Sequence, residues 1–338
     1  MKLKINNVRI SLRQEQTLEQ AVCRKCGIPR DALGSVRIVR KAVDARKKND
    51  ICLNYHVLAE VETGGRQAKR LLADRDITQY QEQQQPTLEL GTLPLSAPPV
   101  VIGAGPAGLL AALQLAEHGY KPLLLERGKP VAQRVQDVQR FWQTGEFNPA
   151  SNVQFGEGGA GTFSDGKLTT RIGDELCGFV TEVFLQHGAP AEIAWKQKPH
   201  VGTDLLRGVI TSIRKEIEAL GGEVHFNTAL TGFEQKNGRL TGIFTTGGTF
   251  PCEALVFAVG HSARDTFGML MDSGLVLECK PFSVGFRAEH LQSEIEKSLY
   301  HEAAGHPALP RGEYQLSQHV GDRCVYTFCM CPGGQVVA

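Results

Sequence analysis

The sequence lacks any long apolar segment, because no run approaches the roughly 18 residues that a membrane-spanning helix needs. Its first residues, MKLKINNVRISLRQ, alternate polar and apolar types and contain no apolar block of a signal peptide. The nine cysteines are odd in number and irregularly spaced, which is not the pattern of a disulfide-stapled secreted domain. We therefore expect a cytoplasmic protein with free thiols, whose partner is a small-molecule substrate and not a membrane.

Net charge is also small, at +1, but it hides an asymmetry along the chain. Residues 1–50 carry 13 Lys and Arg against 5 Asp and Glu, a balance of +8, and the remaining residues, with 24 against 31, have a balance of −7. Such a basic segment suits a nucleic acid or an acidic partner. It has no RNA-binding signature and few aromatic residues on which bases could stack. We favour the interpretation that this basic segment docks on the acidic remainder of the same chain over the interpretation that it binds a nucleic acid.

The sequence divides into a small N-terminal part and a larger α/β part. Residues 1–85 read as a basic α+β module, in which TLEQAVCRKC forms a helix with Thr17 as its N-cap and Gly27 just past its end. Residues 86–99 have the Pro content of a linker. From Val100, two short apolar runs flank a Gly-rich stretch and a helical pattern, which predicts a βαβ unit and a parallel sheet.

The stretch VVIGAGPAGLLAAL carries a nucleotide-binding pattern, Gly103-x-Gly105-x-x-Gly108, between the predicted strand and helix. In this pattern Gly103 permits a tight turn, Gly105 lets the backbone approach a pyrophosphate, and Gly108 lets the helix pack closely on the sheet. Pro106 falls in the first helical turn, beside Ala107, where its missing N–H costs nothing. The free N–H groups of this turn and the helix dipole would face the phosphates.

The second predicted strand, PLLLERG, ends at Glu126, 18 residues after Gly108. A carboxylate there can accept hydrogen bonds from an adenosine ribose and would repel a 2′-phosphate, which argues against NADP at this site. Arg127 follows directly, and Arg134 could reach a cofactor phosphate.

Two later stretches favour FAD over NAD. The first, NVQFGEGGAGTFSDGKLTTR, is Gly-rich, and successive backbone N–H groups in such a loop can form an anion-binding nest. Its Lys167 could place a cation near a reduced, anionic flavin. The second, ALVFAVGHS, is a buried strand with a small residue at its end, which lets the chain pass close to a cofactor. The cofactor-binding candidates from these stretches are Gly158, Gly159, Gly161, Ala258 and Gly260.

These motifs together resemble the FAD-binding domain of the glutathione-reductase-type flavoproteins. More closely, VQFGEGGAGTFSDGKL, KPHVGTD, PFSVGFRAEH and CMCPGG resemble a family of uncharacterised bacterial FAD-dependent dehydrogenases, over nearly the whole chain. The resemblance implies FAD and a redox reaction, with NAD(P)H as a candidate electron donor, and it implies no substrate. We expect an incomplete, Rossmann-like FAD-binding α/β domain over residues 100–279 with an inserted antiparallel β region, and the start of a substrate domain over residues 280–338.

Two alternatives stay open. The same Gly103–Glu126 site could serve an NAD-linked dehydrogenase, or the chain could be a nucleic-acid-binding protein with a regulatory nucleotide domain.

Several single residues have both a chemical and a structural interpretation. His200 could be a general acid or base, or a hydrogen-bonding residue near a helix cap. Arg287 could hold a substrate carboxylate, although an ion pair is the commoner role. Cys329 and Cys331 could relay electrons to a flavin or could be small buried residues.

The pair Cys23-x-x-Cys26 falls at the end of its predicted helix, where the dipole disfavours a thiolate, and it lacks partners for a zinc site. We expect no bound metal.

Proteins of the resembled type close the FAD site with a late strand that ends in Gly-Asp. Gly173-Asp174 comes too early in the chain, and Gly321-Asp322 reads as a hairpin turn. We therefore expect a C-terminally truncated chain with low FAD affinity.

Overall fold

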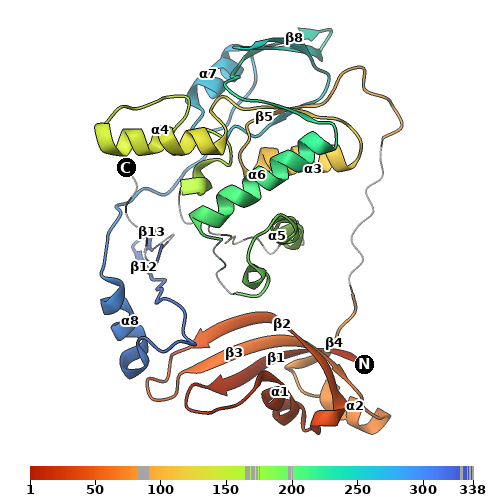
Figure 1. The fold of residues 1–338 in the computed structure, drawn as a ribbon, viewed down its shortest axis with the longest axis vertical. Coiled ribbons are helices and arrows are strands. Elements are labelled where there is room, and N and C mark those ends of the chain that lie inside the picture. Colours follow the sequence, from red (N-terminus) through yellow and green to blue (C-terminus); the bar gives the residue numbers. More distant parts are fainter. Residues whose placement is uncertain are drawn as a thin grey trace. The chain divides into compact units, whose positions relative to one another are not determined.

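The computed structural model describes residues 1–82, 91–163, 168, 172, 174, 176–196, 199, 201–327, 330–332, 334 and 336. The chain forms two compact units (Figure 1). The first contains Met1–Thr87, Ala194–Pro199 and Phe286–Val337, and the second contains Leu88–Ile193, His200–Gly285 and Ala338.

The N-terminal part of the first unit is a four-stranded antiparallel sheet with two helices on one face (Figure 1). In chain order its elements are β1 (Lys2–Ser11), α1 (Leu18–Cys26), the 3₁₀ turn η1 (Arg30–Ala32), β2 (Leu33–Asp44), β3 (Cys52–Val61), α2 (Gly65–Leu72) and β4 (Ile77–Gln79). The strand order β2-β3-β1-β4 is that of a split βαβ fold. Burial alternates along β1 on either side of a register shift between Ile5 and Val8, and Leu3 and Ile5 pack with Val22 of α1 and Leu71 of α2 in one core. The opposite face of the sheet carries no helix of this module.

Helix α1 begins and ends as its sequence predicts. Thr17 Oγ1 accepts a hydrogen bond from the Gln20 N–H (3.2 Å), and Gln20 Oε1 accepts one from the Thr17 N–H (3.0 Å), which makes a capping box. Gly27 ends the helix in the left-handed region, at φ 62°. Cys26 is buried in the last turn, and burial raises the pKa of its thiol to about 11, so the Cys23–Cys26 pair has no thiolate character on the Cys26 side.

Residues near the C-terminus belong to the same unit as this module. They form α8 (Gln292–Tyr300), η4 (His301–Ala303) and a hairpin of β12 (Ser317–Val320) and β13 (Arg323–Tyr326). The predicted Gly321-Asp322 turn lies between these two strands. Ala308 and Leu309 pack against the core of the N-terminal module. The start of a substrate domain over residues 280–338 stays a prediction.

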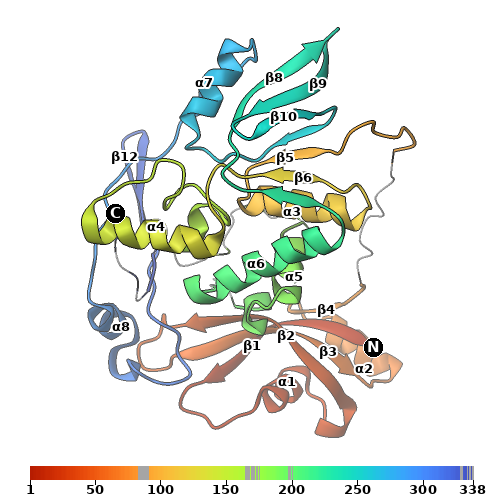
Figure 2. The same ribbon diagram turned by 45° about the horizontal axis from the view of Figure 1, so that its top comes forward.

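The second unit confirms the predicted parallel, Rossmann-like sheet (Figure 2). Its strands, in the spatial order β11-β5-β6-β7, are Leu255–Phe257, Val100–Ile102, Leu123–Leu125 and Glu223–His225. The helices of this unit are α3 (Pro106–Glu117), α4 (Val131–Thr144), α5 (Leu176–Gln186), α6 (Thr203–Ala219) and α7 (Arg264–Asp272), with 3₁₀ turns η2 (Ala160–Phe163) and η3 (Ala191–Ala194). Because the chain leaves β5 toward β6 on one side and returns as β11 on the other, the carboxyl end of β5 is the switch point at which such sheets bind ligands.

The predicted antiparallel insertion is present between β7 and β11. It consists of β8 (Leu230–Lys236), β9 (Arg239–Thr245) and β10 (Gly248–Pro251). Asn237 and Gly238, with φ of 52° and 74°, make the β8–β9 turn that this dipeptide favours. No helix within the described residues is long and apolar enough to cross a membrane.

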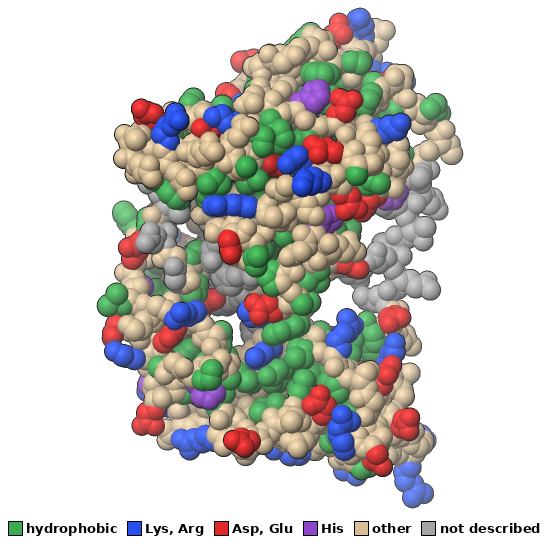
Figure 3. Space-filling view, in the orientation of Figure 1, with side chains coloured by type: hydrophobic (Ala, Val, Ile, Leu, Met, Phe, Trp, Pro, Cys, Tyr) green, Lys and Arg blue, Asp and Glu red, His purple; other side chains and the backbone are tan. Residues whose placement is uncertain are grey.

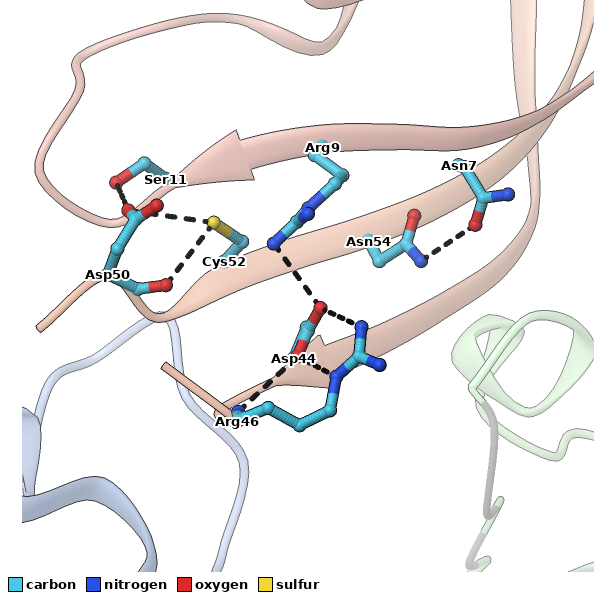
Figure 4. Close-up of polar contacts among 8 residues, drawn as sticks. All are labelled: Asn7, Arg9, Ser11, Asp44, Arg46, Asp50, Cys52 and Asn54. Carbon is cyan, nitrogen blue, oxygen red and sulfur yellow. Dashed lines mark hydrogen bonds and ion pairs between the residues drawn. The ribbon is translucent and has the colours of Figure 1, made fainter. Parts of the chain in front are cut away.

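Polar contacts at the end of β2 make the first unit sensitive to acid (Figure 4). Asp44 accepts hydrogen bonds from Nε and Nη2 of Arg46, both at 2.8 Å, and lies 3.3 Å from Nη2 of Arg9. The hydrogen bonds from Arg46 are the main cause that lowers the pKa of Asp44 to about 2. A lowered carboxyl pKa contributes stability that is present above the unfolded pKa near 4 and is lost as the pH falls toward 2.

We therefore expect Asp44→Asn to lower the melting temperature at pH 6, and the difference from wild type to shrink as the pH falls from 4 to 2. Thermal unfolding across this pH range measures the effect. Asp31→Asn is the control, because Asp31 is exposed and forms no ion pair among the described residues. If the melting temperatures of wild type and Asp44→Asn differed as much at pH 2 as at pH 6, the lowered pKa of Asp44 would not be the source of this stability.

Candidate functional site

The turn between β5 and α3 has the form of a dinucleotide-binding turn. Gly105 is the N-cap of α3 and Pro106 its first residue, and no side chain caps this end of the helix. The N–H groups of Ala107 and Gly108 have no intrahelical partner at these positions and are left for a ligand. A Cβ placed on Gly105 would have only the Gly159 Cα within 4 Å, at 3.9 Å. A side chain or ligand group at this position would therefore meet no closer protein atom.

The other two glycines of the pattern are required by the protein itself. A Cβ on Gly103, whose φ is 99°, would lie 2.5 Å from the Ala258 carbonyl oxygen. A Cβ on Gly108 would lie 1.8 Å from the Gly103 carbonyl oxygen and 3.3 Å from the Ala258 Cβ. Ala258, just past β11, thus packs on the turn, while Gly260 faces open space. Contact of Ala258 and Gly260 with a cofactor stays a prediction.

Glu126, at the end of β6, holds the turn in place. Its side chain is only 5% exposed. Oε2 accepts a hydrogen bond from the Ala104 N–H (2.7 Å) and Oε1 accepts one from the Gly128 N–H (2.8 Å). Each carboxylate oxygen has two acceptor sites, so the predicted bond from a ribose hydroxyl is compatible with this arrangement. The turn-holding role was not visible in the sequence, because the partner in the turn, the Ala104 N–H, lies 22 residues away.

Glu126→Ala is accordingly expected to lower both stability and nucleotide affinity. The change leaves two backbone N–H groups without their charged acceptor, which costs about 2–3 kcal/mol in the free energy of unfolding. Urea unfolding of the ligand-free protein measures the loss in the free energy of unfolding separately from any change in nucleotide affinity. An unfolding free energy equal to that of wild type would show that the two hydrogen bonds contribute nothing.

The second Gly-rich stretch lies beside the α3 turn, and its predicted contact with the cofactor stays a prediction. The Gly158 N–H donates to the Ala104 carbonyl (2.8 Å), and a Cβ on Gly159 would lie 3.1 Å from Pro106 Cδ. Gly161 is part of η2 and has open space around its Cβ position. Two glycine-rich segments about 50 residues apart therefore form one surface at the carboxyl end of β5.

Arg134 of α4 fixes this second stretch from within. The side chain is fully buried. Its Nε donates to the Asn152 carbonyl (2.8 Å), Nη1 to the Glu157 carbonyl (2.7 Å) and Nη2 to the Val153 carbonyl (2.9 Å). Burial lowers the pKa of Arg134 to about 10, against the opposing effect of nearby Glu126 and Glu157, so the group keeps its charge at neutral pH. Its predicted phosphate contact stays a prediction, and its observed role is to shape the loop.

Glu157 is a site residue that the sequence did not reveal. Its carboxylate is fully buried and accepts from the Val131 N–H at the start of α4 (2.7 Å) and from Arg214 Nε of α6 (2.7 Å). It therefore joins the Gly-rich loop to two helices. The only signal in the sequence was an acidic residue within an apolar, Gly-rich run.

The remaining site residues predicted from the sequence either do not lie at the α3 turn or fall outside the described residues. Arg127 pairs with Asp265 (2.5 Å) and lies over the Phe155 ring, 4.9 Å from its centroid. Arg287 is exposed and belongs to the first unit. The candidates Lys167, His200 and Cys329 lie outside the described residues. Among the residues that the structure describes, no three His, Cys, Asp or Glu side chains gather as a metal site.

Three family models match parts of this chain. Residues 281–338 match "FAD-dependent protein, C-terminal domain-like", residues 101–154 match "NAD(P)-binding Rossmann-like domain", and residues 2–60 match a domain of unknown function (DUF8436). Residues 281–338 are thus similar to the C-terminal domain of FAD-dependent proteins. This finding confirms the resemblance and agrees with the FAD prediction.

A protein of Clostridium beijerinckii, itself described as uncharacterized, is 45% identical over 344 residues. The alignment covers 100% of this chain and 64% of the relative, so the chain spans less than two thirds of the length of that protein.

Solved structures with a similar chain path include glycine oxidase from Bacillus cereus and THI4 of Thermovibrio ammonificans. The first has a TM-score of 0.34 and 14% identity, over 52% of this chain and 58% of the other. The second has a TM-score of 0.36 and 17% identity, over 53% of this chain and 64% of the other. Likenesses of this size carry no argument about activity.

Proposed function

We propose that the second unit binds FAD at the turn between β5 and α3 and serves a flavin-dependent oxidoreduction. The observation that carries the proposal is the N-terminus of α3, which has no side-chain cap and faces open space at Gly105. A helix N-terminus with a close-approach glycine is the recurrent pyrophosphate site of Rossmann-like folds. Glu126, at the end of the neighbouring strand, would accept a further hydrogen bond from the ribose.

The residues of this chain would hold and orient the cofactor. FAD, when bound, supplies hydride transfer to or from a substrate. The α3 turn would bind the pyrophosphate, and the Gly158–Gly159 segment beside it would present further backbone N–H groups. Arg134 and Glu157 keep that segment in one conformation. A dehydrogenase that draws electrons from NAD(P)H is the finer form of this proposal.

An NAD-linked dehydrogenase is the second candidate, and the match of residues 101–154 to an NAD(P)-binding domain favours it. The two candidates differ in which nucleotide the protein binds. The flavin proposal predicts that the chain takes up added FAD, and that the visible absorption of the bound flavin bleaches in an anaerobic screen with NADH, NADPH or an organic substrate. A colourless protein that binds NAD but not added FAD would decide for the second candidate.

A further inference from the structure

The helix-free face of the N-terminal sheet gathers basic side chains from three strands. The register places Lys4 of β1 and Arg37 of β2 on either side of Leu58, and places Arg40 of β2 opposite His56. Arg9 of β1 lies opposite Asn54 on the same face, as Figure 4 also shows. We define the basic face as Lys4, Arg9, Arg37, Arg40 and His56.

The charge of the basic face is not neutralised at its centre. Lys4, Arg37 and Arg40 are exposed, and within the described part of the chain they form no ion pair. The acids of this face stand at its ends, where Asp44 pairs with Arg9 and Glu60 lies opposite Lys2. On the side of the first unit that Figure 3 shows, acidic and basic side chains are instead mixed.

The surroundings of His56 give a second sign of this positive field. Burial lowers the pKa of His56, the charges of Arg40 and Lys4 lower it further, and the charge of Asp76 opposes them. Both strands that flank β3 also depart from regular pairing at this residue, with a register shift between Ile5 and Val8 on one side and between Ile38 and Arg40 on the other. β-Bulges of this kind often re-aim side chains at functional surfaces.

We propose that the basic face binds the phosphate backbone of a single-stranded nucleic acid. A sheet face that is open, flat and lined by Arg and Lys fits a polyanion, and guanidinium groups can both bind phosphates and stack on bases where aromatic residues are absent. The core of a protein–protein interface is usually apolar, whereas the apolar side chains on this face are Leu58 and the small Ala42, both half-buried. The charge balance alone had favoured docking within the chain, because the sequence did not show that the cations share one face.

The test uses the full 338-residue chain and a fluorescein-labelled 15-residue oligouridylate. We expect saturable binding that weakens with salt, with a slope of log K against log [salt] of about −2 for three phosphate contacts. The variant K4Q/R37Q/R40Q should bind at least tenfold more weakly and should lose most of that slope. The control K48Q/R66Q/K69Q removes the same charge from exposed residues outside the basic face and should bind as wild type does.

Lysine acetylation followed by mass spectrometry tests the same contact without any variant, since the oligouridylate should protect Lys4 and not Lys48. Several outcomes would overturn the proposal: no salt-dependent binding, equal losses in the two triple variants, or no protection of Lys4. Equal or tighter binding of a 15-residue polyglutamate would assign the face to an acidic protein segment instead. None of these outcomes depends on whether the second unit binds FAD.

Discussion

Gly105→Val is expected to weaken FAD binding at least about 100-fold while leaving the fold in place. The isopropyl group would project into the open space before α3 and displace the pyrophosphate from the first-turn N–H groups. Loss of two hydrogen bonds to a charged group, at roughly 1.5–3 kcal/mol each, corresponds to a factor of this size. The φ of Gly105 is −74°, which any residue adopts, and the nearest atom to its Cβ is 3.9 Å away. The cost in stability should stay within about 1 kcal/mol, the usual range for a changed N-cap.

Gly65→Val is the matched control for that prediction. Gly65 also lies at the start of a helix, and a Cβ there would have no atom within 4 Å. FAD titration followed by flavin fluorescence, together with thermal unfolding of both variants, separates affinity from stability. If Gly105→Val bound FAD as wild type does, or if it melted far below Gly65→Val, the cofactor would not lie in front of α3.

Arg134→Met should lower the free energy of unfolding by about 3–5 kcal/mol, the range for removing one partner of a buried charged network. The methionine fills much of the volume but donates no hydrogen bond, so the carbonyls of Asn152, Val153 and Glu157 lose their shared donor. The loop that borders the α3 turn would lose its fixed shape, and FAD affinity should fall with it.

Arg140→Gln on the same helix provides the comparison. The Arg140 side chain is 67% exposed and lies 4.0 Å from Glu146, so its loss should change stability by less than about 0.5 kcal/mol. Urea unfolding of both variants measures the difference. Equal midpoints for Arg134→Met and Arg140→Gln would show that the buried guanidinium does not hold the loop.

The sequence predicted those parts of the fold that local chemistry determines. Thr17 and Gly27 mark the ends of α1 because caps depend on residues within one turn, and Asn237-Gly238 marks a hairpin because its backbone conformation suits few other residues. The Gly103–Gly108 pattern located the α3 turn for the same reason.

Long-range contacts were the part that sequence patterns could not predict. The turn-holding bonds of Glu126, the position of Glu157 between two helices and the packing of Ala308 and Leu309 on the N-terminal core all join residues far apart in the chain. The three residues of β7 pair in parallel with β6, more than 90 residues earlier in the chain. A run so short carries too little pattern to show which sheet it joins.

The central claim is that the α3 turn binds the pyrophosphate of FAD, and a competition titration tests it most directly. FAD is added to the purified chain, and its displacement by ADP and by FMN is followed by chromatographic assay of the FAD that the protein retains, because FMN is itself fluorescent. The account predicts one FAD per chain, displaced by ADP, which shares the adenosine and the pyrophosphate, and not by FMN, which has neither. Absence of saturable FAD binding, or displacement by FMN as effective as by ADP, would contradict it.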